Sequence, residues 1–254
     1  MRDGGGPQLP ALRKEVASYD PAEFPPFAVT VDIVLLTVAD EFSVMLVRRG
    51  VDPFAGVLAL PGGFVLPDES VEDAAHRELA EETGLSASAL PGVHLEQLAT
   101  FGDVGRDPRM RVVSVAYLGL SRLTPLPTAG TDAADAQWLP VSTALAGHLA
   151  FDHREMLEAA VERVRAKLEY TTLATTLAGE AFTLGDLHRI YEIVWNEELD
   201  LANFRRKVLA TDGFVESTGA KRVSTAGGAP ATVYRRGSGT LLNPPLSRRP
   251  RAGH

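Results

Sequence analysis

The sequence of 254 residues contains no cysteine, which excludes both a disulfide framework and a thiolate metal site. It also lacks an apolar run approaching the roughly 18–20 residues that a helix needs to cross a bilayer. The first twenty residues, MRDGGGPQLPALRKEVASYD, have no hydrophobic segment of the kind that secretory signals carry. We therefore expect a cytoplasmic protein without a membrane partner, and we find no internal repeat.

A hydrophobic content of 45% is enough for real cores, and the length suits one large or two small domains. The charge is unevenly divided. Residues 200–254 hold ten basic and three acidic side chains, a net charge of +7, whereas the whole chain carries −8. Such asymmetry suggests a nucleic-acid contact at the C-terminal end, although basic tails also simply aid solubility.

Residues 63–85, GFVLPDESVEDAAHRELAEETGL, carry the clearest chemical pattern. A helix here places Glu78, Glu81 and Glu82 at positions i, i+3 and i+4, on one face. Clustered carboxylates repel one another unless a cation lies between them, and hard oxygen ligands suit Mg²⁺ or Mn²⁺. The alternative interpretation is an acidic amphipathic helix whose charged face is only solvated.

Local features predict where this helix begins and ends. Ser70 is a suitable N-cap, and Glu72 and Asp73 favour the positive end of the helix dipole. Gly84 fits a C-cap. Arg77 lies one turn before Glu81 and can pair with it. Three apolar positions predict the face that packs into the core: Ala74, Ala75 and Leu79.

At every fixed position these residues match G-x5-E-x7-R-E-U-x-E-E-x-G-U, where U is a bulky aliphatic residue, and so resemble the signature of the Nudix hydrolases. The resemblance implies cleavage of a nucleoside diphosphate linked to another moiety, with Mg²⁺ or Mn²⁺ bound. It makes Glu78 and Glu82 direct metal ligands, and Glu81 either a third ligand or the base that activates water. The positions that shape the loop are Gly63, Glu69, Arg77 and Gly84.

The surrounding sequence supports such a domain over residues 23–150, after an N-terminal extension, 1–22. Residues 28–37, 42–49 and 111–120 predict strands, because they are rich in β-branched and other apolar residues. Trp138-Leu139-Pro140 resembles the element that precedes the last helix of Nudix domains. The fold class implied is α/β, an α/β/α sandwich around a mixed sheet.

Arginines near this region point to a phosphate-bearing ligand. Arginine forks match phosphate geometry, although each arginine alone is as readily a solvated surface charge. The segments PFAG-x-x-ALPGGFV and FGDVGRDPR-x-RVVSVAY resemble a Nudix branch that handles ADP-ribose, which often carries Trp at the position of Leu58. The candidate diphosphate or ribose contacts are Arg48, Arg49, Arg106 and Arg109.

The C-terminal part predicts a second, α+β domain over residues 171–240. Residues 152–168 predict a helix that either links the domains, as a connection over 151–170, or closes the first core. Residues 184–195 and 201–210 predict two more helices, and 214–236 two strands around a glycine-rich turn. Helix, turn, helix and β-hairpin is the order of a winged helix-turn-helix domain. A basic tail, 241–254, rich in Pro and Arg, follows.

In a winged helix the second helix enters the major groove and the hairpin contacts phosphates. Residues 201–210 contain Arg205, Arg206 and Lys207, which cannot all be buried; the cap of this helix is Asp200 or Asn203. The alternative is a small helical domain that dimerises or shapes the active site. The candidate DNA contacts are Asn203, Arg205, Arg206, Lys207, Lys221 and Arg222.

Together the two halves resemble the Nudix-related transcriptional regulators of NAD metabolism over roughly residues 20–247. Two hypotheses follow. The first is an enzyme that splits ADP-ribose into AMP and ribose 5-phosphate, favoured because every signature carboxylate is present. The second is a repressor that binds double-stranded DNA and senses ADP-ribose or a related nucleotide with little or no hydrolysis. The resemblance also implies a homodimer, which suits paired half-sites.

Overall fold

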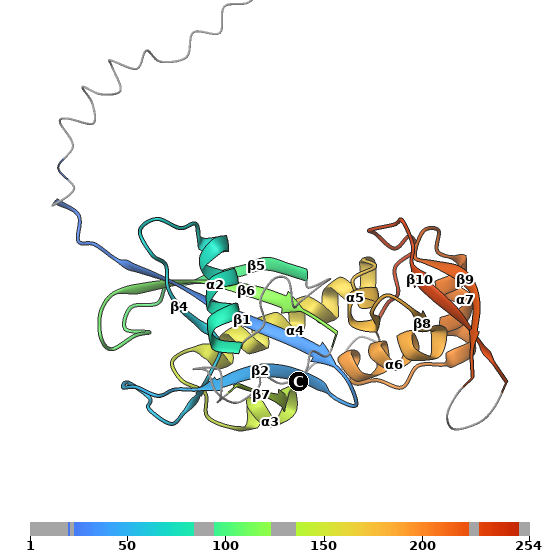
Figure 1. Cartoon of the computed structure of the whole chain (residues 1–254), viewed down its shortest axis with the longest axis horizontal. Coiled ribbons are helices and arrows are strands. Elements are labelled where there is room, and N and C mark those ends of the chain that lie inside the picture. The colour runs from blue at the N-terminus through green and yellow to red at the C-terminus, as the bar shows by residue number, and fades with distance from the viewer. Residues whose placement is uncertain (1–19, 21–22, 84–93, 123–135, 224–228, 249–254) are drawn as a thin grey trace, which may run out of the picture.

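The computed structural model describes residues 20, 23–83, 94–122, 136–223 and 229–248. It has two parts, a large sheet flanked by helices and a smaller helical region with its own sheet (Figure 1). Within the described residues, no helix is both long and apolar enough to cross a bilayer.

The large sheet has mixed strand directions, as the sequence predicted, and the described residues contribute seven strands to it. Its centre is the parallel pair β1 (Ala28–Val38) and β6 (Val112–Leu120), in register from Ala28 opposite Val112 to Leu36 opposite Leu120. The other strand pairs are antiparallel: β1 pairs with β2 and β4, β2 also pairs with β3 and β7, and β5 pairs with β6. These strands are β2 (Phe42–Arg48), β3 (Leu58–Ala59), β4 (Gly62–Phe64), β5 (His94–Phe101) and β7 (Ala136–Pro140).

Helices cover both faces of this sheet, so the predicted sandwich is confirmed. Helix α2 (Val71–Thr83) packs on one face, where Val31, Ile33 and Leu35 of β1 meet its buried side chains. Helix α4 (His153–Tyr170) packs on the other face, against Val34 and Leu36. Strand alternation explains the division, because successive side chains of β1 point to opposite faces. The short α3 (Val141–Ala146) follows β7.

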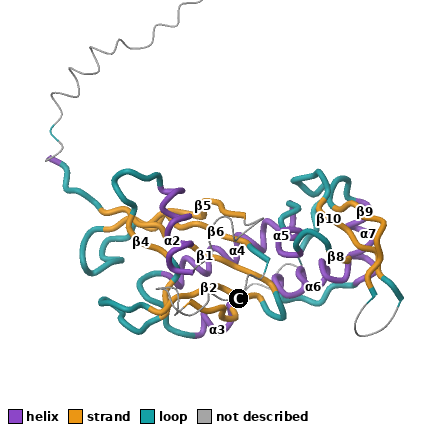
Figure 2. Tube along the Cα trace, viewed as in Figure 1, coloured by secondary structure: helices purple, strands orange, loops and turns teal. Residues whose placement is uncertain are grey.

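The C-terminal part has the predicted order of a winged helix (Figure 2). Helix α6 (Leu184–Trp195) begins with a capping box between Thr183 and Asp186. Helix α7 (Leu201–Ala210) is capped by Asp200, whose Oδ1 accepts the N–H of Asn203 at 2.7 Å. The wing strands are β9 (Val215–Arg222) and β10 (Ala231–Arg236). In this part, the sequence analysis did not predict α5 (Ala174–Ala178) or the short strand β8 (Phe182–Thr183), which pairs with β10.

Helix α4 both closes the first core and joins the two parts, so the two alternatives for it are not exclusive. One continuous core holds β1 residues, the apolar face of α4 and the buried side of α6. Asp152 occupies the N-cap position of this helix, but its side chain makes no cap hydrogen bond.

The start of the predicted tail is docked on α4. Leu242 and Leu246 are buried, and their N–H groups donate to the carbonyls of Tyr170 and Glu169. Arg248 pairs with Glu162 and Glu169, so this basic residue is held within the protein. Residues 249–254 and most of the N-terminal extension lie outside the described residues.

Candidate functional site

The signature loop and helix α2 are built by local contacts. The side chains of Ser70 and Asp73 cap the helix reciprocally, with Asp73 N–H donating to Ser70 Oγ at 3.1 Å. The predicted start near Ser70 is therefore confirmed. Ala74, Ala75 and Leu79 are buried against the sheet, as expected. The predicted cap at Gly84 lies outside the described residues.

Arg77 holds the loop to the helix. Its Nη2 lies 2.6 Å from Oε1 of Glu69 and also donates to the carbonyl of Phe64 at 3.1 Å. Its Nη1 lies 2.7 Å from Glu78 and 3.1 Å from Glu81. Arg77 thus pairs with Glu81 one turn later, as predicted, and also binds Glu69, another of the positions that shape the loop. These bonds raise the pKa of Arg77 above its usual value, the hydrogen bond with Glu69 most of all.

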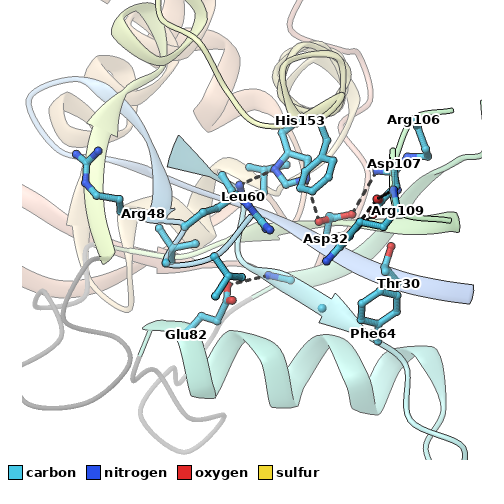
Figure 3. A pocket seen from close by; sticks show the side chains of 18 residues that line it. Thr30, Asp32, Arg48, Leu60, Phe64, Glu82, Arg106, Asp107, Arg109 and His153 are labelled. Carbon is cyan, nitrogen blue, oxygen red and sulfur yellow. Dashed lines mark hydrogen bonds and ion pairs between the residues drawn. The ribbon is translucent and has the colours of Figure 1, made fainter. Parts of the chain in front are cut away.

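The three helix carboxylates do not share one environment. The Glu78 side chain is 11% exposed and that of Glu81 is 60% exposed. Glu82 faces the loop, where its Oε2 accepts the N–H of Gly62 at 3.0 Å (Figure 3). Glu78 lies so close to Gly63 that a Cβ there would be 2.3 Å from Oε1. Glu78 and Glu82 therefore lie beneath two consecutive glycines, whereas Glu81 points to solvent.

The pKa values of Glu78 and Glu82 are both raised above the usual value for a glutamate. Burial raises the pKa of Glu82 to about 7; the charges of Glu78 and Asp32 add to the rise, and the Gly62 N–H opposes it. Burial also raises the pKa of Glu78, against the lowering effect of Arg77. A divalent cation beside them would stabilise their ionised forms.

The donor set fits such a cation in part. Glu78 is buried and Glu82 is half-buried beside a cavity. Such carboxylates suit Mg²⁺, which commonly binds through one or two carboxylates and keeps several waters. The described residues contain no cluster of three or more His, Asp or Glu side chains arranged to hold a metal. The assignment of Glu81 as a third ligand or as the base therefore stays a prediction.

Beside Glu82 lies a cavity of about 540 Å³. It opens between the signature loop, β1 and the segment that leads into α4 (Figure 3). Thr30 contributes a buried hydroxyl without a hydrogen-bond partner among the described residues. All four predicted arginines line the cavity: Arg48, Arg49, Arg106 and Arg109.

Three of these arginines are exposed or half-buried: Arg48, Arg49 and Arg109. Arg48 donates to the carbonyl of Gly56, and Arg49 donates to that of Pro53. The guanidinium carbons of Arg49 and Arg109 lie 4.8 and 5.7 Å from the ring centre of Phe151. Arg109 also forms an ion pair with Asp107 at 2.7 Å. Stacking on an aromatic ring leaves guanidinium N–H groups available to an anionic ligand.

Arg106 lines the cavity but is the most deeply buried of the four predicted arginines. Its side chain is only 5% exposed, and it forms a bidentate ion pair with Asp152 through Nε and Nη2, at 2.7 and 2.6 Å. Asp32 lies 3.7 Å from the same Nη2. Arg106 therefore joins the cavity wall to the N-terminus of α4.

Asp32 and His153 are site residues that the sequence analysis missed. His153 Nδ1 accepts the N–H of Leu60 at 2.9 Å, which assigns the ring proton to Nε2, 3.3 Å from Asp32. Burial alone would raise the pKa of Asp32, but His153, Ser114 and Arg106 together bring it below its usual value. Asp32 could have been noticed in the sequence, because it is the one acidic residue in the apolar stretch AVTVDIVLL. No local sequence pattern marks His153.

Helix α7 presents the predicted basic residues toward solvent. Arg205 and Arg206 are exposed, and Lys207 is half-buried. Phe204 and Val208 anchor the opposite side of the helix in the core. Arg206 is steadied by the side-chain oxygen of Asn203 at 2.6 Å. A basic, exposed face on the second helix is the arrangement that a winged helix offers to the major groove.

The two predicted wing residues differ. Lys221 is exposed on β9. Arg222 instead folds back, with Nη1 2.9 Å from Asp186 of α6 and Nη2 donating to the carbonyl of Ala181. Arg222 therefore fastens the wing to the helices, a contact that spans 36 residues and that the sequence analysis did not anticipate.

Comparison with known proteins agrees with both halves. Residues 26–160 match the NUDIX domain, and residues 174–236 match the NrtR DNA-binding winged helix domain. The ADPR responsive transcriptional repressor NtrR of Acinetobacter baylyi is 34% identical over 223 residues, which are 87% of this chain and 86% of that protein. An ADP-ribose pyrophosphatase of Methanocaldococcus jannaschii is 37% identical over 115 residues, 45% of this chain and 63% of that protein.

A solved structure gives the same result for both parts together. NrtR of Shewanella oneidensis in complex with a 27mer DNA has 34% identity and a TM-score of 0.70, covering 84% of this chain and 99% of that one. The chain therefore belongs to the Nudix-related transcriptional regulators, in which a Nudix domain is joined to an NrtR-type winged helix.

Proposed function

We propose that this protein is a DNA-binding repressor whose Nudix domain senses ADP-ribose or a closely related nucleotide. One observation carries the proposal: a single chain holds an arginine-lined cavity of about 540 Å³ in one part and an exposed basic helix, α7, in the other. The similarity to a repressor described as ADPR responsive extends over both parts. The regulator is thus favoured over the hydrolase that the signature alone placed first.

The cavity suits a nucleoside diphosphate. The guanidinium groups of Arg49 and Arg109 lie over the ring of Phe151 in the cavity wall, and their remaining N–H groups can bind phosphate oxygens. Arg48 lines the same wall. The unpartnered hydroxyl of Thr30 offers a hydrogen bond to a polar ligand such as a ribose.

For DNA, helix α7 is the proposed recognition element. Arg205 and Arg206 lie on its exposed side, where they can reach base edges or phosphates, and Asn203 positions Arg206. Lys207 and Lys221 are proposed phosphate contacts. Arg222 would act through the wing that it holds in place.

A homodimer would present two α7 helices to paired half-sites. A regulator of this kind would act in the cytoplasm, beside the chromosome.

The test is a DNA-binding titration with and without nucleotide. The probe is a duplex selected from a random library by the wild-type protein, and its dissociation constant is measured at fixed salt. ADP-ribose is expected to change that constant by about 5–150-fold, the usual range of allosteric coupling. Equimolar AMP and ribose 5-phosphate are the matched control, because they supply the parts without the diphosphate link. Absence of any ADP-ribose effect would refute the sensor.

Hydrolysis of ADP-ribose is the second candidate. The intact signature and the similarity to an ADP-ribose pyrophosphatase both favour it. Glu78 and Glu82 would hold Mg²⁺ or Mn²⁺, which would neutralise phosphate charge and lower the pKa of bound water. Glu81 would become a ligand or a base only if its side chain turned away from Arg77.

Turnover is tested by measuring AMP formation from ADP-ribose with Mg²⁺. If the protein is a hydrolase, Glu82→Gln should abolish the product, whereas Arg205→Ala with Arg206→Ala should leave it unchanged. Product formation that survives Glu82→Gln would show that the metal assignment is wrong. Saturable ADP-ribose binding without product would make the carboxylates part of a sensor only.

A further inference from the structure

Helix α4 touches both candidate sites. Its N-terminus forms part of the wall of the nucleotide cavity, through His153. Its C-terminal turns are bonded to helix α6 of the winged helix. At about 1.5 Å per residue, its 18 residues span about 27 Å, and its inner face is buried throughout.

At the cavity end the connection is a charged pair. Asp152 occupies the N-cap position, yet its carboxylate is committed to Arg106 by two hydrogen bonds, at 2.6 and 2.7 Å. Both side chains are largely buried, at 15% and 5% exposure. Because Arg106 lines the cavity, an anionic ligand there competes with Asp152 for the guanidinium.

At the other end the winged helix satisfies backbone groups of α4. If the helix continued, the Thr172 N–H would donate to the carbonyl of Leu168. Here the Thr172 N–H donates to the carbonyl of Thr240 instead, and Tyr191 Oη donates to the carbonyl of Leu168 at 3.0 Å. Trp195 Nε1 donates to the carbonyl of Arg165 at 3.1 Å, and Arg165 Nε donates to that of Val194 at 2.9 Å. A displacement of α4 along or about its axis must therefore move α6 or break these bonds.

We propose that the Asp152–Arg106 pair is the switch that reports nucleotide occupancy to the winged helix, with α4 as the rigid element between them. The proposal rests on the function proposed above. A diphosphate draws Arg106 away from Asp152, the N-terminus of α4 shifts relative to the sheet, and α6 carries α7 with it. Asp152 acts here as a positioning residue and does not contact the nucleotide.

The coupling requires that the ligand bind the two arrangements of α4 with different affinity, since otherwise it shifts no equilibrium. The competition for Arg106 supplies that difference. The coupling is also reciprocal: if ADP-ribose changes the affinity for DNA by some factor, DNA must change the affinity for ADP-ribose by the same factor.

The experiment measures four dissociation constants for the full-length protein: DNA alone, ADP-ribose alone, and each in the presence of saturating amounts of the other. Asp152→Asn keeps the shape of the side chain and removes its charge. Trp195→Phe keeps most of the packing and removes the bond to Arg165. Glu158→Gln is the matched control, since it breaks an exposed ion pair with Arg154 on the same helix.

Asp152→Asn should bind ADP-ribose at least as tightly as the wild type, because the neutral asparagine side chain competes less strongly for Arg106. The coupling factor, which is the ratio of the DNA dissociation constants with and without ADP-ribose, should fall toward 1. Trp195→Phe should reduce the same factor with ADP-ribose affinity unchanged, and Glu158→Gln should alter neither. Trp195→Phe tests the proposal independently if Asp152→Asn fails to fold.

The outcomes separate the two proposals. If ADP-ribose leaves the DNA affinity of the wild-type protein unchanged, both the sensor and the switch are refuted. A wild-type response that persists undiminished in both variants refutes the switch alone and leaves the sensor standing. Weaker binding of both ligands with an unchanged ratio would show that Asp152 is merely structural, and would also overturn the switch.

Discussion

Gly63 and the carboxylate of Glu78 are in such close contact that no side chain fits between them. A Cβ on residue 63 would lie 2.3 Å from Oε1 and 2.6 Å from the carboxyl carbon of Glu78. The glycine of the signature is therefore required by the position of a helix residue further along the chain. Its neighbour Gly62 is similarly crowded, because a Cβ there would lie 2.2 Å from the carbonyl oxygen of Val31.

Replacing Gly63 by Ala should displace Glu78 and disturb the site. The crowded atoms are the end of the flexible Glu78 side chain, so we expect this carboxylate to shift, which weakens ADP-ribose binding. The loss in unfolding free energy should be about 1 kcal/mol, the low end of the usual range for overpacking. Urea unfolding and calorimetry measure the two effects. Gly102→Ala is the control, because its Cβ would meet Val113 at an ordinary 3.8 Å. Equal behaviour of the two variants would contradict the steric argument.

Glu96 should make stability depend on acid pH. Burial tends to raise its pKa, but Lys167 and His94 outweigh burial and lower it below 4.5. A lowered folded-state pKa stabilises the protein above the unfolded value, and that contribution is lost as pH falls through the folded value. We therefore expect Glu96→Gln to destabilise the protein by about 1–2 kcal/mol at pH 7 and to converge on the wild type well below pH 4.5.

The measurement for Glu96 is thermal unfolding from pH 7 to pH 3. Glu158→Gln serves as the exposed comparison, with an expected cost of about 0.3–0.5 kcal/mol for a pair one helical turn apart. A constant gap between Glu96→Gln and the wild type at all pH values would show that the ion pair is not the cause.

Tyr191→Phe should weaken the junction between α4 and α6. The buried hydroxyl satisfies the Leu168 carbonyl, and its loss leaves that acceptor without its partner, at a cost of about 1–3 kcal/mol. Denaturant unfolding gives the change. Tyr170→Phe provides the matched control, since that side chain is 43% exposed. A cost no larger than the control's would show that water replaces the lost bond.

Arg205 and Arg206 should affect DNA binding without affecting the fold. Alanine at a phosphate contact should reduce the slope of log affinity against log salt by about 1, whereas alanine at a base contact should cost about 1–3 kcal/mol and relax sequence preference. Arg222→Ala should instead lower the melting temperature, because Arg222 bonds to Asp186 and Ala181. Circular dichroism melts and salt titrations distinguish the two classes. Undiminished DNA binding in the Arg205–Arg206 double variant would exclude α7 as the recognition helix.

Short-range features of the site were predictable from the sequence. The start of α2 depends on Ser70 and Asp73, which are three residues apart, and the α6 capping box of Thr183 and Asp186 has the same spacing. The Arg77 contacts reach at most 13 residues along the chain. Such patterns are visible in sequence because the bonding partners occupy fixed offsets.

By itself, then, the sequence determined the order of the elements, the identity of the signature helix and the family. Only the tertiary structure decided the partners of Arg106, Arg222 and Asp32, and the docking of the tail on α4. These contacts join residues 36 to 121 positions apart, and their energy depends on burial and distance that no local pattern encodes. The exposure of Glu81 was decided in the same way, since a helix fixes which side chains share a face but not what covers that face.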